Sequence, residues 1–358
     1  MFGSITVFQV TGGMPESAQI LADALKDAPF AATGPTQEKS IGWVPPREEN
    51  GALVEAINGQ WIAEVTTESR AVPGSAIKDL AEARAKEIEE KTGRKPGKKE
   101  MRSIKEECLQ ELLPKAFPKR SSTVVWFNPS KGWLVMGTTS SSKTDEIITQ
   151  LVRLLPQFSC ARLNTNSSPS TAMTRWLSEK EIPGALDFGT SLELKAMDDS
   201  RATAKFGSHY LLCDEVCRHL HMGKTPTKMG LNWDGKVDFS LDGEMHISKL
   251  KFSIEKEPSD EAVDFFDGTV AIETGELEKM ITELIETLGG AMPFGTAAEA
   301  QSNESKGSGA AAASADAAEH AFIITAADAS IAKGHEVLAR VREMGRGIPE
   351  MSEAGAQD

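Results

Sequence analysis

The chain has 358 residues, 53 of them Asp or Glu and 39 Lys or Arg, so its formal net charge is -14. Its composition, 40% apolar and 26% charged, excludes wholesale disorder and fibrous repeats. No apolar run approaches the roughly 20 residues that span a membrane, and no basic residue precedes Lys26 to start a secretory leader. We therefore expect two or three folded units in the cytoplasm, with an acidic balance that argues against nucleic acid.

The N-terminal region reads as one α+β unit. Residues 4–10 alternate like a strand, and a helix is predicted from Pro15 by apolar residues at turn spacing. Residues 42–46 must be extended, because each proline in Pro45-Pro46 disfavours a helical predecessor. A second strand is expected at 59–67.

A helical period then runs from 75 to 113, with Ser75 as the predicted N-cap and a break at 92–97. The simplest structure is a helical hairpin. Residues 78–120 carry a net charge of +4, which leaves -18 for the remaining chain. Positive charge is concentrated at the tip of this hairpin, in the side chains of Lys91, Arg94, Lys95, Lys98, Lys99, Arg102 and Lys105.

Residues 122–128 and 132–138 predict paired strands, and a helix is expected over 144–155 with Asp145 and Glu146 in its first turn. The Ser-, Thr- and Asn-rich stretch at 164–174 is expected to be a linker or a long loop.

Between 231 and 252, two Asp-Gly pairs separate alternating segments, which predicts an antiparallel meander. A closing helix carries Leu277, Met280, Ile281, Leu284, Ile285 and Leu288 on one face and stops at Gly289-Gly290. The rest has linker composition and a net charge of -5, so we interpret 291–358 as a mobile acidic tail.

Two segments resemble chemical sites. One of them contains residue types that bind soft metal ions, namely Cys213, Cys217, His219 and His221. On a helix, however, the two histidines point in different directions, so buried thiols and surface histidines are the plainer interpretation.

The other segment, residues 137–144, lies between a strand and a helix like a phosphate loop, but Ser142 stands where that motif needs glycine. A Ser-rich strand-to-helix turn with a capping residue is the plainer interpretation of this segment, and no catalytic residue or metal site is predicted.

The basic elements favour a different class of function. Besides the hairpin tip, Lys115, Lys119 and Arg120 cluster around Phe117, and Lys224 and Lys228 form a short basic loop. Each alone is a solvated surface feature, but together they suggest a surface that contacts duplex phosphates rather than stacking single-stranded bases.

A series of motifs also resembles a known family. They are Gly42-Trp43-Val44-Pro45-Pro46, Asn58-Gly59-Gln60, Leu112-Leu113-Pro114-Lys115-Ala116-Phe117, the strand around Trp126, Lys228-Met229-Gly230-Leu231-Asn232-Trp233 and Leu284-Ile285-Glu286-Thr287-Leu288-Gly289-Gly290. In this order they are similar to the RdgC family of bacterial recombination-associated proteins, over about residues 1–290.

The resemblance implies an α+β protomer that pairs into a closed, ring-shaped homodimer around duplex DNA, without cofactor, metal or catalytic centre. It implies little sequence preference and antagonism of RecA in recombination. By position, Phe117 is similar to a dimer-contact residue, Lys115 to its basic neighbour and Lys224 to a lysine near the other contact. Where relatives carry Lys-Lys-Gln, this chain has Gly207-Ser208-His209, which leaves Lys205 as the expected phosphate contact.

The expected fold class is therefore α+β, with antiparallel sheets, packed helices and a protruding helical hairpin. We divide the chain into a central α+β domain (1–74 and 121–175), a basic hairpin with the dimer contact (75–120), a second α+β domain with the meander (176–290) and the tail (291–358). The expected function is non-enzymatic binding of duplex DNA by a nucleoid-associated protein. The alternatives are a DNA-stimulated nucleotidase using 137–144 and a protein-interaction adaptor acting through the acidic tail.

Overall fold

The computed structural model describes residues 1–48, 50–198, 201–253 and 262–293, apart from the side chains of 262–264. The described residues all fall within one compact unit. Except for residues 291–293, the predicted acidic tail lies outside the described residues, as does the adaptor function that depends on it. The division of the remaining chain into domains stays a prediction.

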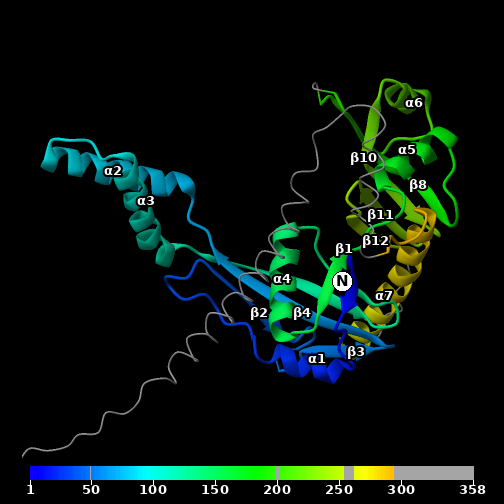
Figure 1. The fold of residues 1–358 in the computed structure, drawn as a ribbon, viewed down its shortest axis with the longest axis horizontal. Coiled ribbons are helices and arrows are strands. Elements are labelled where there is room, and N and C mark those ends of the chain that lie inside the picture. Colours follow the sequence, from blue (N-terminus) through cyan, green and yellow to red (C-terminus); the bar gives the residue numbers. More distant parts are fainter. Residues whose placement is uncertain (49, 199–200, 254–261, 294–358) are drawn as a thin grey trace, which may run out of the picture. The chain divides into compact units, whose positions relative to one another are not determined.

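The described strands form one twelve-stranded sheet in the order β2-β4-β5-β6-β1-β12-β11-β10-β8-β9, with β3 beside β4 and β7 beside β1 (Figure 1). The bounds are β1 (Ser4–Gly12), β2 (Lys39–Val44), β3 (Val54–Ile57), β4 (Gln60–Arg70), β5 (Pro118–Asn128), β6 (Trp133–Met136), β7 (Ser159–Arg162), β8 (Leu186–Ala196), β9 (Thr203–Phe206), β10 (Lys224–Trp233), β11 (Val237–Asp242) and β12 (Ile247–Phe252). Neighbouring strands pair antiparallel throughout. The predicted α+β class is confirmed.

Seven α-helices accompany the sheet in the described part of the chain. They are α1 (Ala18–Leu25), α2 (Gly74–Thr92), α3 (Lys98–Leu112), α4 (Ser141–Leu154), α5 (Pro169–Glu179), α6 (Asp214–His221) and α7 (Ala262–Thr287), and a 3-10 turn, η1 (Leu113–Lys115), follows α3. The predicted hairpin of α2 and α3 is confirmed, and it leaves the sheet between β4 and β5 (Figure 1).

Two large cores lie on opposite faces of the N-terminal strands. In β4, Ile62 packs in one core with α5 and α7, whereas Ala63 and Val65 pack in the other with α1 and α4. Alternation along a strand sends successive side chains to opposite faces, so a strand covered on both sides is apolar at consecutive positions. The hairpin has a separate, small core whose buried members are Ala81, Ile104 and Cys108.

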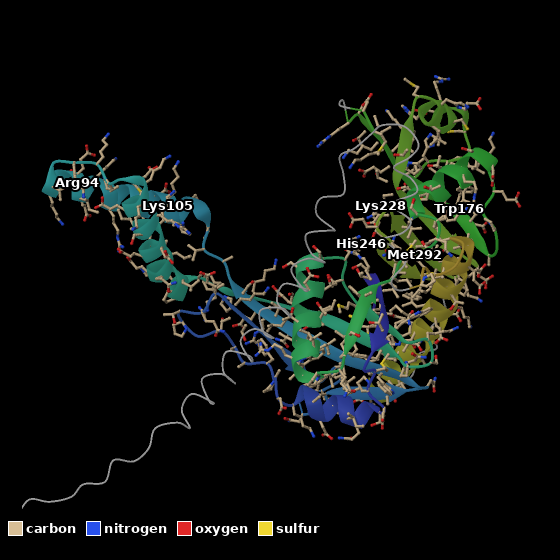
Figure 2. All side chains as sticks on the ribbon, in the orientation of Figure 1. Arg94, Lys105, Trp176, Lys228, His246 and Met292 are labelled. Atoms are coloured by element: carbon tan, nitrogen blue, oxygen red, sulfur yellow. The ribbon has the colours of Figure 1, made fainter. Side chains whose placement is uncertain are left out.

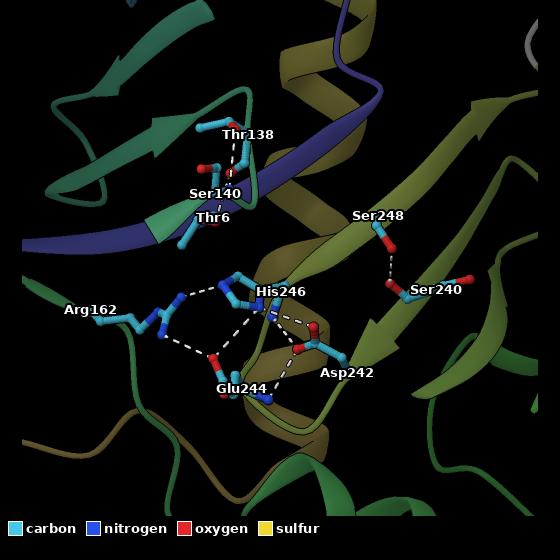
Figure 3. A network of polar contacts seen from close by, with 9 residues as sticks. All are labelled: Thr6, Thr138, Ser140, Arg162, Ser240, Asp242, Glu244, His246 and Ser248. Atoms are coloured by element: carbon cyan, nitrogen blue, oxygen red, sulfur yellow. Dashed lines mark hydrogen bonds and ion pairs between the residues drawn. The ribbon is translucent and has the colours of Figure 1, made fainter. Parts of the chain in front are cut away.

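Strand β1 joins the two halves of the sheet. Ser4 and Ile5 pair with β12, whereas residues from Phe8 onward pair with β7 along the same edge. A polar network spans the point where β7 and β12 diverge: Arg162 contacts Nε2 of His246, and His246 Nδ1 lies 3.0 Å from Asp242 Oδ2 (Figure 3). Because arginine can only donate, Nε2 of His246 accepts and Nδ1 carries the proton that is shared with Asp242.

The predicted meander is present as β10, β11 and β12. Its first turn joins the paired residues Trp233 and Val237 through three residues, of which Asp234 has φ 50° and Gly235 φ 63°, left-handed conformations that an Asp-Gly pair favours. The second turn differs from the prediction, because Asp242 Oδ1 accepts hydrogen bonds from the backbone N–H groups of Glu244 and His246. This longer turn takes Met245 out of the strand expected there.

The closing helix is confirmed as α7, with its six predicted apolar residues buried and Gly289 and Gly290 at positive φ beyond its end. Three local expectations were wrong. Helix α2 begins after Pro73, so Ser75 is inside its first turn. Helix α4 begins at Ser141, which places Asp145 and Glu146 beyond the first turn. The presumed loop at 164–174 includes the start of α5, because Ala172, Met173 and Trp176 give it a buried face.

Candidate nucleic-acid interface

The hairpin tip is a short turn between α2 and α3. Gly93 ends α2 at φ 72°, a left-handed conformation that glycine adopts without a Cβ clash, and its N–H donates to the Glu89 carbonyl. Gly97 precedes α3, and its N–H donates to Glu100 Oε2 over 3.4 Å. These caps bring the C-terminal end of α2 and the N-terminal end of α3 together.

Seven cations gather at this tip. Lys91, Arg94, Lys95, Lys98, Lys99, Arg102 and Lys105 are all exposed. Arg94 pairs with Glu100 at 3.3 Å, and no ion pair joins the other six to a carboxylate among the described residues. Figure 2 shows Arg94 and Lys105 on the hairpin. The sequence-predicted tip residues are therefore brought together as a cluster of seven cations, six of which have no neutralising partner among the described residues.

The position of Lys98 and Lys99 is unfavourable for the helix that carries them. Both lie in the first turn of α3, where the unpaired N–H groups already give a helix a partial positive charge. Lysine at this end slightly destabilises a helix but strengthens the local positive potential. Residues that are unfavourable for their helix, like these two lysines, are expected mainly at positions where function needs their charge.

The second predicted cluster lies at the base of the hairpin. Phe117 is 92% exposed between η1 and β5. Lys115 lies 3.6 Å from Glu111. Strand β5 begins at Pro118 rather than at residue 122, so Lys119 and Arg120 are strand residues opposite Ser69 and Glu68. The extended pairing follows from the length of β4, which continues to Arg70.

A network missed by the sequence analysis holds this base in place. Buried Glu68 accepts hydrogen bonds from Thr33 N (2.8 Å) and Thr33 Oγ1 (2.5 Å), and Arg120 Nε pairs with its other oxygen at 2.5 Å. The Thr33 hydroxyl, Arg120 and the Thr33 N–H lower the pKa of Glu68 from its ordinary value of 4.5 to about 2. Arg70 donates to the carbonyl of Ala116 over 3.0 Å. The backbone next to Phe117 is thus held by hydrogen bonds, and Arg120 already has a carboxylate partner.

The third predicted cluster is divided by the structure. Lys224 and Lys228 lie on strand β10, not in a loop. The pairing of β10 with β8 shifts register between Pro226 and Lys228, so Thr227 is an extra residue. Such a bulge reverses the alternation of side chains between the two faces of the strand. Lys224 therefore lies on the same face as buried Pro226, whereas Lys228 lies on the face opposite to that of buried Met229. Lys205, on the edge strand β9, lies 3.0 Å from Glu193.

The segments considered for other chemistry have local structural roles. Lys143 of the phosphate-loop-like segment donates to Ser121 Oγ over 3.2 Å. Cys213 precedes α6, and His221 Nδ1 lies 2.7 Å from the carbonyl oxygen of Cys217. In the part of the chain that the structure describes, no three His, Cys, Asp or Glu side chains are arranged to hold a metal ion.

The comparison with protein families matches residues 1–291 to the model described as "Putative exonuclease, RdgC". The chain belongs to the RdgC family. Proteins named recombination-associated protein RdgC include one from Bordetella pertussis, 33% identical over 294 residues that cover 81% of this chain and 98% of the relative. Another from Dechloromonas aromatica is 34% identical over 276 residues, or 75% of this chain and 90% of the relative.

The RdgC match covers the hairpin and every cationic cluster described above, which confirms the resemblance found from the ordered motifs. It associates the protein with DNA recombination. The names of these relatives mention no enzymatic activity, whereas the description of the family model mentions an exonuclease. Among the described helices, none combines the length and the apolar character needed to cross a membrane.

Proposed function

We propose that this RdgC-family protein is a non-enzymatic, sequence-independent binding protein for double-stranded DNA. It acts in recombination as a ring-shaped homodimer on the nucleoid and limits the access of RecA to the duplex. The observation that carries the proposal is the hairpin tip, where six exposed cations have no ion-pair partner among the described residues. Cations of this kind suit phosphates, which position a protein on DNA without specifying bases.

The salt dependence of binding tests this proposal. Each phosphate neutralised by a lysine or arginine should contribute about 0.9 to the slope of log affinity against log salt concentration. Changing Lys95, Lys98 and Lys99 together to Gln should lower the slope by up to about 2.7. Lys26, Lys78 and Lys279 each have a carboxylate partner, so the same change there is the control with equal net charge. Salt-independent affinity, or strong preference for one sequence, would refute duplex-backbone binding.

The assembly is tested separately through Phe117. An aromatic side chain that is 92% exposed, on a backbone fixed by a hydrogen bond, is typical of a residue that anchors an interface. Phe117→Ala should weaken self-association by about 2 kcal/mol, roughly 30-fold, in sedimentation measurements across a concentration series. Phe30→Ala, near Arg120 at the same base, is the control. An equally tight dimer in the Phe117 variant would show that the ring closes elsewhere.

The non-enzymatic part of the proposal has its own measurement. Duplex DNA labelled at either end should remain intact when it is incubated with the protein and Mg²⁺ or Mn²⁺. Release of labelled nucleotides that co-purifies with the protein and is abolished by a single carboxylate substitution would instead support an exonuclease.

A further inference from the structure

The two halves of the sheet, β1 to β7 and β8 to β12, are joined differently on their two faces. On the first face one core contains both Ile5 and Val7 of β1 and Ile247 of β12, so apolar packing crosses the junction. On the second face Phe8 of β1 packs in the other core, with α1 and α4. Arg162 is opposite Phe8 in the pairing of β1 with β7, and opposite residues share a face. Arg162 therefore lies on the second face, at the end of β7.

A histidine connects the two halves on this second face. His246 lies in the turn between β11 and β12; its Nδ1 is 3.0 Å from Asp242 Oδ2, and its Nε2 contacts the guanidinium of Arg162 (Figure 3). Glu244, in the same turn, lies 3.6 Å from Arg162 Nη1 and 3.9 Å from His246 Nδ1. We call these four residues the latch. Arg162 belongs to the first half of the sheet, and the other three residues belong to the second.

The neutral imidazole fits this arrangement, and the protonated one does not. Arginine can only donate hydrogen bonds, so its contact with His246 needs the lone pair of Nε2. A second proton on the ring occupies that lone pair and leaves two donors, both positively charged, facing each other. The proton on Nδ1 stays with Asp242 in either form. Protonation therefore breaks the hydrogen bond between the halves and keeps the one within the second half.

The other charges around the histidine do not reverse this direction. Asp242 and Glu244 attract a protonated ring, but they lie in the same half as His246 and accompany it when the halves move. Lys228 of β10 is opposite Asp242 in register and belongs to that half as well. Strand β1 carries no charged residue. Among the charged contacts of His246 within the described residues, only Arg162 comes from across the junction.

The arginine is only partly satisfied in its present position. Its Nε is buried without a hydrogen-bond partner among the described residues. A buried donor without a partner destabilises the state that contains it, so a guanidinium released from His246 gains hydrogen bonds to water by moving outward. The side chain of its ion-pair partner, Glu244, is 73% exposed, and exposed ion pairs contribute little stability. The contact with His246 is thus what holds Arg162 across the junction.

We propose that His246 and Arg162 form a pH-sensitive latch between the two halves of the sheet. Neutral His246 closes the latch, and a proton on Nε2 opens it. The closed state holds fewer protons than the open state, so closure is favoured above the range in which histidine titrates, about pH 5 to 8, and is lost as the pH falls through it. Opening lets β12 and β7 separate from the edge of β1 while the core of the first face persists. This inference does not depend on the proposed binding of DNA.

Hydrogen exchange of the full chain at about pH 8 and about pH 5.5 tests the latch. Two amides report on the junction: the N–H of Leu163 donates to the Val7 carbonyl over 3.0 Å, and that of Leu250 to the Gly3 carbonyl over 3.1 Å. Their protection factors, which correct for the intrinsic effect of pH on exchange, should fall at least about tenfold at the lower pH, as expected for one lost hydrogen bond to a charged group. Amides between β10 and β11 should keep their protection.

Two variants fix the latch in opposite states. In His246→Gln the side-chain amide oxygen can accept from Arg162 and takes up no proton in this range, so the junction amides should stay protected at both pH values. In Arg162→Met the hydrogen bond is absent, so their protection should be low at both. His221→Gln is the matched control: His221 is exposed, with Nδ1 2.7 Å from the Cys217 carbonyl oxygen, and this variant should respond to pH like the unchanged protein.

Three results would overturn the latch. The junction amides of the unchanged protein could be equally protected at both pH values, or their loss of protection at low pH could persist in His246→Gln. Amides between β10 and β11 could also lose protection to the same extent, which would mean that low pH destabilises the whole unit. The first and third comparisons use the unchanged protein, so they decide the question even where Arg162→Met does not fold.

Discussion

The small core of the hairpin predicts that α2 and α3 can open without the rest of the protein. Ile104 is 5% exposed and packs with Ala81 and Cys108, and this cluster is separate from the two large cores. Ile104→Ala removes three buried carbon atoms and leaves a cavity, which should cost about 2–4 kcal/mol. Because few other buried side chains hold the two helices together, most of this loss should be local.

Hydrogen exchange measures the effect directly. A loss of about 3 kcal/mol should accelerate exchange of the protected amides in α2 and α3 by roughly 100-fold, while amides of the central strands keep their protection. The duplex salt slope should fall as well, because the tip cations lose their common arrangement.

The control is Ile62→Ala, in β4, where the side chain is fully buried in the large core. It should lower the unfolding temperature of the whole unit. The reasoning would be refuted if Ile104→Ala lowered that temperature equally, or if exchange in α2 and α3 did not change.

Two further predictions concern titratable groups. Glu68 has a folded-state pKa of about 2 against an ordinary 4.5, so its stabilising contribution is present above 4.5 and is lost as the pH falls towards about 2. Glu68→Gln should therefore flatten the dependence of urea stability on pH in this window; an identical pH dependence would mean that Thr33 and Arg120 do not stabilise the carboxylate. Burial raises the pKa of Cys160 to about 12, so this thiol should react more slowly than free cysteine with a disulfide reagent at pH 8 until urea exposes it. Rapid reaction in the folded protein would contradict that assignment.

Much of the fold could be predicted because it depends on neighbours along the chain. The spacing of Ile104 and Cys108 indicates a helix face, Gly93 marks the end of α2, and Asp234-Gly235 specifies a tight hairpin. The concentration of cations at the hairpin tip also follows from sequence alone, because every residue of the tip lies within one short segment.

The tertiary structure decided which face of a strand each side chain occupies. No pattern in the neighbouring sequence predicts that Thr227 is an extra residue in β10, yet this residue places Lys224 and Lys228 on opposite sides of the strand. The extra residue in β12 likewise depends on how β12 pairs with β11. Register is set by contacts between strands distant in the chain, and a shift of one residue moves a side chain to the other face.

The same reason explains the acidic total of -14. The sequence determined how many charges exist and where the basic segment lies. The tertiary structure decided which cations are neutralised: Glu68 reaches Arg120 and Glu193 reaches Lys205 through strand pairing, while six cations of the tip have no such partner among the described residues. Ion pairs act over a few ångströms, so they depend on the distances that folding creates rather than on the sum of the charges.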